Sequence, residues 1–117
     1  MKLQQKRARF TSLVGKLLAH AESIGFEVTL GETIRSEAVA KWNASQGIGI
    51  ANSLHGVGLA VDINLFRNGI YLTKSEDYEV LGKWWEKQST HDLLCCWGGR
   101  FKRADGNHFS VEHNGVR

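Results

Sequence analysis

Two histidines and two aspartates, in two short stretches, have the types and spacing of a metal-dependent hydrolytic site. His55 and Asp62 lie in the stretch ANSLHGVGLAVDINLF, and Asp105 and His108 begin and end the stretch DGNH. Histidine nitrogens and carboxylate oxygens bind zinc, and a set of three protein ligands leaves a fourth position for water, as in catalytic zinc sites. Asp105 lies three residues before His108, so its carboxylate could stand beside the metal and accept a proton from that water.

The position of Asp62 also favours a cation. Asp62 stands between Val61 and Ile63, in a stretch that is typical of a strand entering a core. A buried carboxylate is costly unless it is paired or binds a metal. From the residues alone, an ordinary hydrogen-bonded Asp62 with the histidines at the surface remains an open alternative.

Other candidate ligands fit a metal site less well. Cys95 and Cys96 are the only cysteines, and they lack both the CxxC spacing and the second pair of a structural zinc site. Adjacent cysteines rarely form a disulfide with each other, so synthesis in a reducing compartment is expected. Glu112 and His113 offer a rival interpretation, in which the stretch HFSVEH contributes further ligands.

The helices that must support these residues are indicated by apolar periodicity. Apolar residues at three- and four-residue spacing from Phe10 to Ile24 predict a first helix that ends at Gly25. A short second helix is expected over residues 36–46, and a third over residues 75–88. The third helix should bury Tyr78, Leu81, Trp84 and Trp85.

Alternating and apolar stretches predict the strands. They cover residues 26–32, 59–66, 70–73, 93–97 and 108–113. Phe26, Val28 and Leu30 should share one face, and Asn68-Gly69 predicts a tight hairpin between two strands. Helices segregated from a small, mostly antiparallel sheet indicate an α+β fold.

Length and composition predict a single domain over residues 1–117, with 42% apolar and 23% charged residues. The net charge of +3 fits an anionic polymer or an ordinary soluble surface. Nucleic acid is not expected as a partner, because no nucleic-acid-binding signature is present. The sequence shows no apolar run long enough for a membrane span and no apolar signal segment, so neither membrane insertion nor signal-directed export is expected.

Several of these residues resemble the motifs of a known enzyme family. Residues 53–62, SLHGVGLAVD, resemble the SxHxxGxAxD motif of zinc D-alanyl-D-alanine peptidases. Residues 105–108, DGNH, are similar to the second motif of the phage L-alanyl-D-glutamate endopeptidase branch, in which an acidic residue precedes the last zinc-binding histidine by three positions. WGGRF and TIRSEAVA resemble two further segments, so the similarity covers about residues 28–110.

The resemblance implies a hedgehog/DD-peptidase fold with one catalytic Zn²⁺ ion. It implies His55, Asp62 and His108 as the metal ligands and Asp105 as the general base. Arg35 matches an arginine that positions substrate or stabilises the developing oxyanion in relatives, and is expected to be both catalytic and substrate-binding.

Two more residues are expected at the substrate. Ser53 matches the serine of the first motif, and its hydroxyl would orient a ligand or close a loop. Trp97 is expected to line the substrate groove, together with the loop over residues 47–54, although core packing is an equally open interpretation of this tryptophan.

The implied activity is zinc-dependent cleavage of the L-Ala–D-Glu bond in the peptidoglycan stem peptide by a monomeric phage endolysin. Such a protein would be made in the host cytoplasm and reach the cell wall after holin-type release. Two alternatives stay open. One is a D-alanyl-D-alanine carboxypeptidase or dipeptidase on the same fold, and the other is a non-catalytic zinc- or wall-binding virion protein.

Overall fold

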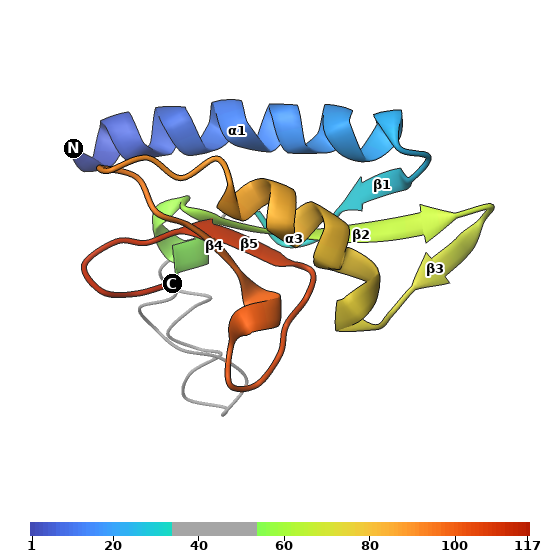
Figure 1. Cartoon of the computed structure of the whole chain (residues 1–117). Coiled ribbons are helices and arrows are strands. Elements are labelled where there is room, and N and C mark those ends of the chain that lie inside the picture. The colour runs from blue at the N-terminus through green and yellow to red at the C-terminus, as the bar shows by residue number, and fades with distance from the viewer. Residues whose placement is uncertain (34–53) are drawn as a thin grey trace.

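The structure is a computed structural model of the 117-residue chain, and it describes residues 1–33 and 54–117. The helix expected over residues 36–46 and the predicted site residues Arg35 and Ser53 lie outside the described residues. The described elements follow the predicted order and form a small α+β domain with an antiparallel sheet of five strands (Figure 1). The predicted fold class is confirmed.

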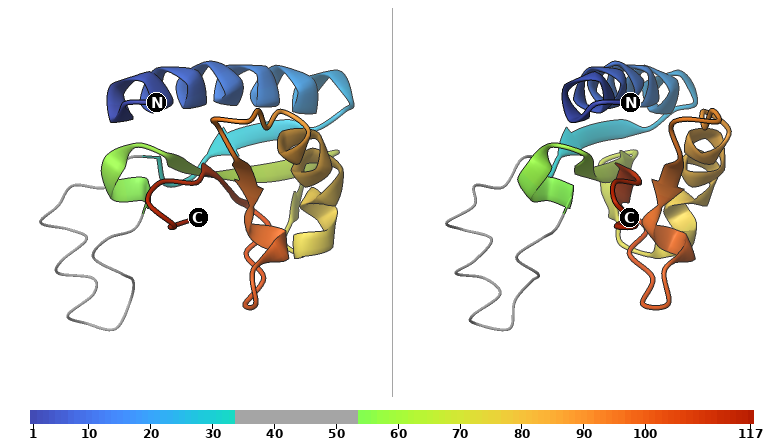
Figure 2. Two further views of the ribbon diagram at one scale, coloured as in Figure 1. Left: turned by 60° about the vertical axis from the view of Figure 1, so that its left-hand side comes forward. Right: turned by 90° about the vertical axis from the view of Figure 1, so that its left-hand side faces the viewer.

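Helix α1 (Leu3–Ser23) runs along one side of the sheet and supplies an apolar stripe to the core. Its buried residues, at the spacing predicted from the sequence, are Phe10, Leu13, Leu17 and Ala21. Gly25 follows the helix with φ of +95°, the left-handed conformation that commonly ends a helix, so the predicted end is confirmed. In both views of Figure 2, α1 lies on one side of the sheet and the turn that leads into Asp105 projects on the opposite side.

Strand β2 is the centre of the sheet. The strands are β1 (Glu27–Leu30), β2 (Ala60–Arg67), β3 (Ile70–Leu72), β4 (Cys95–Trp97) and β5 (His108–Val111). Their order is β1-β2-β5-β4, and β3 pairs with the far end of β2. Because β2 pairs with three other strands, Ile63 and Leu65 are fully buried.

The hairpin between β2 and β3 forms where the sequence predicts it. Asn68 and Gly69 both have positive φ, 54° and 76°, as a two-residue turn of the primed type requires. Tyr78 then holds the base of the hairpin, because its hydroxyl accepts the N–H of Leu65 and donates to the carbonyl of Leu72.

The predicted helix over residues 75–88 is divided in two. Ser75–Tyr78 form a 3₁₀ turn, η2, which leads into the α-helix α3 (Glu79–Glu86). Tyr78, Leu81 and Trp85 are buried as expected, whereas Trp84 is half-buried and stacks on His20 with ring centroids 5.0 Å apart.

The strand predictions need corrections. Strand β1 ends at Leu30 rather than at residue 32. Strand β4 begins at Cys95 rather than at residue 93, because Leu93 pairs with Thr90 in an isolated bridge. Strand β5 ends at Val111, because the chain then turns and pairs again further on. Leu30 is exposed while Phe26 is buried, since Leu30 lies at the rim of an open cavity beneath α1.

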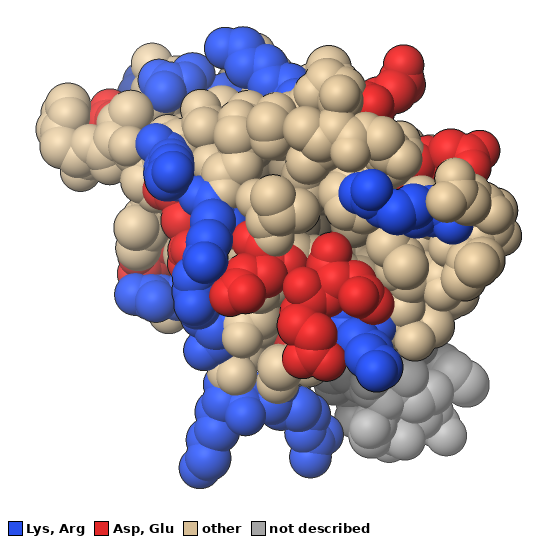
Figure 3. Space-filling model, turned by 45° about the vertical axis from the view of Figure 1, so that its right-hand side comes forward, with Lys and Arg blue, Asp and Glu red and all other residues tan. Residues whose placement is uncertain are grey.

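Charged side chains of both signs lie close together on the face shown in Figure 3. Arg100 binds Glu86 through two nitrogens, both 3.1 Å from carboxylate oxygens, and Lys83 approaches Glu79 within 3.8 Å. The basic excess therefore does not form a continuous surface on that face. In the described residues, no helix combines the length and the apolar character needed to cross a membrane.

Candidate functional site

Pairing of β2 with β5 brings two of the predicted ligands together. Asp62 and His108 are direct partners in the antiparallel register, so their side chains project from the same face of the sheet. His55 lies on the 3₁₀ turn η1 (Leu54–Val57), immediately before β2. Gly58 follows with φ of +73°, a conformation that lets the chain turn sharply into the strand.

The three side chains form a compact cluster. Asp62 Oδ1 lies 3.4 Å from His55 Nε2 and 3.6 Å from His108 Nδ1. One ligand atom from each residue lies within 4.8 Å of the others, and the described residues contain no second such group of histidine, cysteine and carboxylate side chains. Two ligand atoms that each lie about 2 Å from a tetrahedral zinc ion are about 3.3 Å apart, close to the two distances from Asp62 Oδ1.

Burial and hydrogen bonding of the cluster also fit a cation. His55 and His108 are buried, and Asp62 is half-buried. Asp62 Oδ1 is buried without a hydrogen bond, and so is His108 Nε2, within the described part of the chain. A buried carboxylate oxygen that faces two imidazoles without a hydrogen bond is costly by itself, and a divalent cation would remove that cost. The donor set of two imidazoles and one carboxylate therefore fits a single zinc ion.

Contacts of Nδ1 fix the orientation of the His55 ring. Its Nδ1–H donates to the backbone carbonyl of Thr33, 3.2 Å away, and Glu32 Oε1 lies 3.9 Å from the same nitrogen. In the neutral imidazole this bond leaves Nε2 unprotonated and directed at Asp62, the tautomer that a metal ligand requires. Sequence reasoning missed Thr33, because a backbone carbonyl has no residue-type signal.

The electrostatics of the cluster keep Asp62 ionised. Burial acts to raise the pKa of Asp62, but contacts with His108 and His55 outweigh it and lower the pKa to about 2. Burial acts in the opposite sense on His55, and contacts with Asp62 outweigh it, so the pKa of His55 is raised. A metal ion would compete with this proton, which makes metal affinity dependent on pH.

Asp105 lies beside the cluster and is not part of it. Its side chain is exposed at the end of the turn that precedes β5, and it is absent from the group of three close ligand atoms. Partial desolvation and the negative charge of Asp62 raise its pKa, against the opposing effect of His108 and His55. A carboxylate near the metal ligands with a raised pKa suits a general base.

Close backbone packing holds the turn that carries Asp105. The Asp105 N–H donates to the carbonyl of Gly98 at 2.9 Å, and a side chain at Gly98 would overlap the Asp105 carbonyl oxygen. Gly106 donates its N–H to Ser75 Oγ at 3.0 Å and accepts the indole N–H of Trp97 at 2.7 Å. The loop is therefore fixed from three sides.

Three sequence predictions about site residues have different outcomes. Trp97 is 4% exposed and packs against two glycines, as the core-packing interpretation predicts, and its indole N–H donates to the Gly106 carbonyl; its place in the substrate groove stays a prediction. The rival ligand His113 lies near Lys6, with Nδ1 3.2 Å from Nζ, and neither Glu112 nor His113 joins the cluster. The predicted roles of Arg35 and Ser53 stay predictions.

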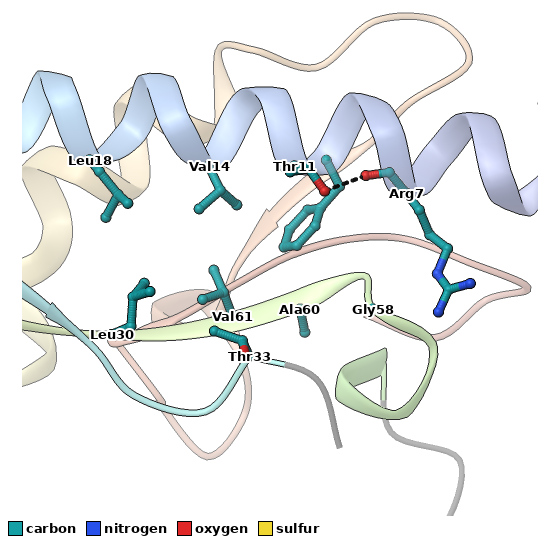
Figure 4. Close-up of a pocket in the computed structure, with 10 residues that line it drawn as sticks. Arg7, Thr11, Val14, Leu18, Leu30, Thr33, Gly58, Ala60 and Val61 are labelled. Carbon is teal, nitrogen blue, oxygen red and sulfur yellow. Dashed lines mark hydrogen bonds between the residues drawn. The ribbon is translucent and has the colours of Figure 1, made fainter. Parts of the chain in front are cut away.

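A separate apolar cavity of about 360 Å³ lies between α1 and the start of β2 (Figure 4). Val14, Leu18 and Val61 line it, and Arg7 closes one end. The described residues that line it include no carboxylate, histidine or cysteine, so its chemistry differs from that of the metal-ligand cluster.

Comparisons with known proteins agree with this geometry. The sequence model of a family described as D-alanyl-D-alanine carboxypeptidase matches residues 47–111, which contain all three clustered ligands. No similar sequence was found among curated proteins. The crystal structure of an L-Ala D-Glu endopeptidase from Serratia marcescens, ChiX, is similar with a TM-score of 0.60 and 24% identity.

The structural similarity covers 73% of this chain and 66% of the Serratia protein, so the chain spans slightly less than two thirds of that protein's length. At this level of identity the likeness shows a shared fold. The similarity does not identify the substrate.

Proposed function

The chain belongs to the D-alanyl-D-alanine carboxypeptidase family of zinc-dependent peptidases, and on that premise we propose that it hydrolyses peptidoglycan. The proposed scissile bond joins L-Ala to D-Glu in the stem peptide. The observation that carries the proposal is the cluster of His55, Asp62 and His108, with Asp105 beside it and outside the ligand set.

Metal binding and proton transfer would fall to different residues of the chain. His55, Asp62 and His108 would hold a zinc ion, which supplies Lewis-acid chemistry by polarising a carbonyl group and lowering the pKa of water. Asp105 would take the proton of the water that attacks the carbonyl carbon. It would then return that proton to the amine nitrogen as the C–N bond breaks, leaving a free carboxylate and a free amine.

The choice of bond rests on two features. The DGNH stretch is similar to the second motif of the L-alanyl-D-glutamate branch. The fold is shared with a protein named as an L-Ala D-Glu endopeptidase. The second candidate, removal of terminal D-alanine, is favoured by the description of the matching family as D-alanyl-D-alanine carboxypeptidase.

The biological role is part of the proposal. We propose a phage endolysin that is made in the host cytoplasm, reaches the wall after holin-type release and acts there as a monomer. The net charge of +3 would favour adsorption to a polyanionic wall. Arg35 and Ser53 are proposed to contact the substrate, as the motifs imply.

Mass spectrometry of digested peptidoglycan tests the activity. Purified sacculi are incubated with the zinc-loaded protein, with a chelated sample, with Asp105→Asn and with the control Asp92→Asn. Asp92 is a suitable control because it is exposed and pairs with Thr90 Oγ1, 2.8 Å away. We expect peptides that begin with D-Glu, abolished by chelation and reduced about 10²- to 10⁴-fold in Asp105→Asn only.

Each other product identifies a different enzyme. Release of D-alanine alone would assign the carboxypeptidase activity, and stem peptides that begin with L-Ala would indicate an amidase. Absence of products with the zinc-loaded protein would favour the non-catalytic wall-binding alternative and contradict the proposal.

A further inference from the structure

A small polar pocket has Asp105 among its lining residues. It has a volume of about 210 Å³ and lies between the β3–η2 connection and the turn over residues 104–107. The described residues that line it include Tyr71, Thr73, Ser75, Tyr78, Asp105 and Asn107. Among the described residues, its lining contains no lysine or arginine and no member of the metal-ligand cluster.

Some polar groups of this pocket already make hydrogen bonds within the protein, and others do not. The Tyr78 hydroxyl both accepts from Leu65 and donates to Leu72, so it is used by the fold. The Ser75 hydroxyl already accepts the N–H of Gly106. Within the described part of the chain, the Thr73 hydroxyl and the Asn107 side-chain amide make no hydrogen bond to protein, and both line the pocket.

The direction of the substrate follows from the chemistry of Asp105. A general base that returns its proton to the leaving amine must lie beside that amine nitrogen. The residue that carries the amine, on the C-terminal side of the scissile bond, is therefore the part of the substrate nearest to Asp105. The pocket that Asp105 lines is the space next to that residue.

We propose that this pocket selects a polar residue on the amine side of the scissile bond, with Thr73 and Asn107 as the specificity-determining residues. Their hydroxyl and amide groups would donate hydrogen bonds to a carboxyl or carboxamide oxygen of that residue. This inference rests on the proposed function, because it takes Asp105 as the base.

The pocket's composition explains why an apolar residue would be rejected. Filling a polar pocket with a hydrocarbon side chain removes water from the Thr73 and Asn107 donors without replacing its hydrogen bonds. Because Asp105 is the only charged residue among the described residues of the lining, an uncharged carboxamide should be accepted at least as well as a carboxylate. A D-glutamyl residue or its amide carries a polar group that can accept these hydrogen bonds, whereas the methyl side chain of D-alanine cannot.

The test compares peptides that differ only in the residue after L-Ala. The three residues are D-Glu, D-Gln and D-homoleucine, the last having the shape of D-Gln with an apolar end. For the zinc-loaded protein we expect kcat/KM for D-Gln to exceed that for D-homoleucine by about 10- to 100-fold, and to equal or exceed that for D-Glu.

Variants locate the selection in the pocket. Thr73→Val and Asn107→Leu keep approximate size and remove the donors, and together they should bring the D-Gln to D-homoleucine ratio close to 1. Thr29→Val is the matched control, because Thr29 is an exposed threonine on β1 outside the pocket, and its ratio should equal that of the unmodified protein. Zinc content is measured for every variant. An unchanged ratio in the double variant, with zinc retained, would overturn the inference.

A binding measurement separates this inference from the proposed function. In a ¹⁵N NMR titration, a peptide that begins with D-Gln, the amine-side product, should shift the Asn107 side-chain amide signals, and the D-homoleucine peptide should not. This shift requires no turnover, so it stands if hydrolysis fails. Equal shifts with both peptides, or none with either, would contradict the inference even if the L-Ala–D-Glu bond is cleaved.

Discussion

The two ends of strand β2 differ in how their polar groups are satisfied. At the end that pairs with β5, Asp62 Oδ1 is buried beside two imidazoles without a hydrogen bond within the described residues. At the end that pairs with β3, Tyr78 satisfies both the Leu65 N–H and the Leu72 carbonyl, and the Asn68-Gly69 turn adopts its preferred conformation. One strand therefore carries a region that needs a ligand and a region that is complete by itself.

This difference separates residues that serve chemistry from residues that serve stability. Substitutions at the β5 end should change metal binding and turnover, whereas substitutions at the hairpin end should change the free energy of unfolding. Three predictions test this separation, and a fourth tests the electrostatics of Asp62 in the metal-free protein.

Replacing Asp62 should have the largest effect. Asp62→Asn removes the charge of one ligand and keeps its shape, so zinc affinity should fall at least about 100-fold and hydrolysis should become undetectable. Asn64→Ala, two positions along the same strand, is the control and should keep zinc affinity within about twofold. Competition titration with a zinc chelator measures both. Retained affinity in Asp62→Asn would remove Asp62 from the ligand set.

Substitutions of two glycines by alanine compare the two ends of β2 directly. In Gly98→Ala the new methyl group would overlap the Asp105 carbonyl and crowd His108 Cβ, so the turn must move and kcat/KM should fall about 100-fold. In Gly69→Ala the methyl group meets nothing within 4 Å, and the positive φ alone should cost about 1 kcal/mol of stability. Kinetics and urea unfolding distinguish the two. Equal activity losses in both variants would contradict the separation.

Removing the Tyr78 hydroxyl should affect stability alone. Tyr78→Phe leaves the buried N–H of Leu65 without its acceptor, which should cost about 2 kcal/mol in the free energy of unfolding. Turnover per folded molecule should remain within about twofold, although Tyr78 lines the polar pocket, because its hydroxyl is already used by the fold. Chemical denaturation combined with active-site titration measures both quantities.

The metal-free protein should lose stability in acid through Asp62. The pKa of Asp62 is lowered in the folded state from 3.8 to about 2. The ionised Asp62 therefore contributes up to about 2 kcal/mol to the free energy of unfolding. This contribution is complete above pH 4 and is lost as the pH falls through about 2. The difference between the unmodified protein and Asp62→Asn, measured by denaturation of chelated samples at several pH values, isolates it. A difference independent of pH in this window would contradict the electrostatic account.

Local patterns explain which parts of the fold were predictable. The periodicity of α1, its end at Gly25 and the hairpin at Asn68-Gly69 depend on residues close in sequence, and all three are found where the sequence predicts them. Leu30 is exposed although alternation predicts it on the face of Phe26, because the space beneath α1 is open at that point. Trp97 is buried because the glycines around it let the chain fold over its ring, which residue type alone does not reveal.

The sequence by itself determined which residues are the candidate metal ligands, because His55, Asp62 and His108 stand in stretches that resemble the motifs of zinc D-alanyl-D-alanine peptidases. Only the tertiary structure decided what surrounds them. The carbonyl of Thr33 behind His55, the fixed turn of Asp105 and the polar pocket at Asn107 come from segments far apart in the chain. Backbone groups and cavities arise where strands and turns meet, and no single stretch of residue types encodes them.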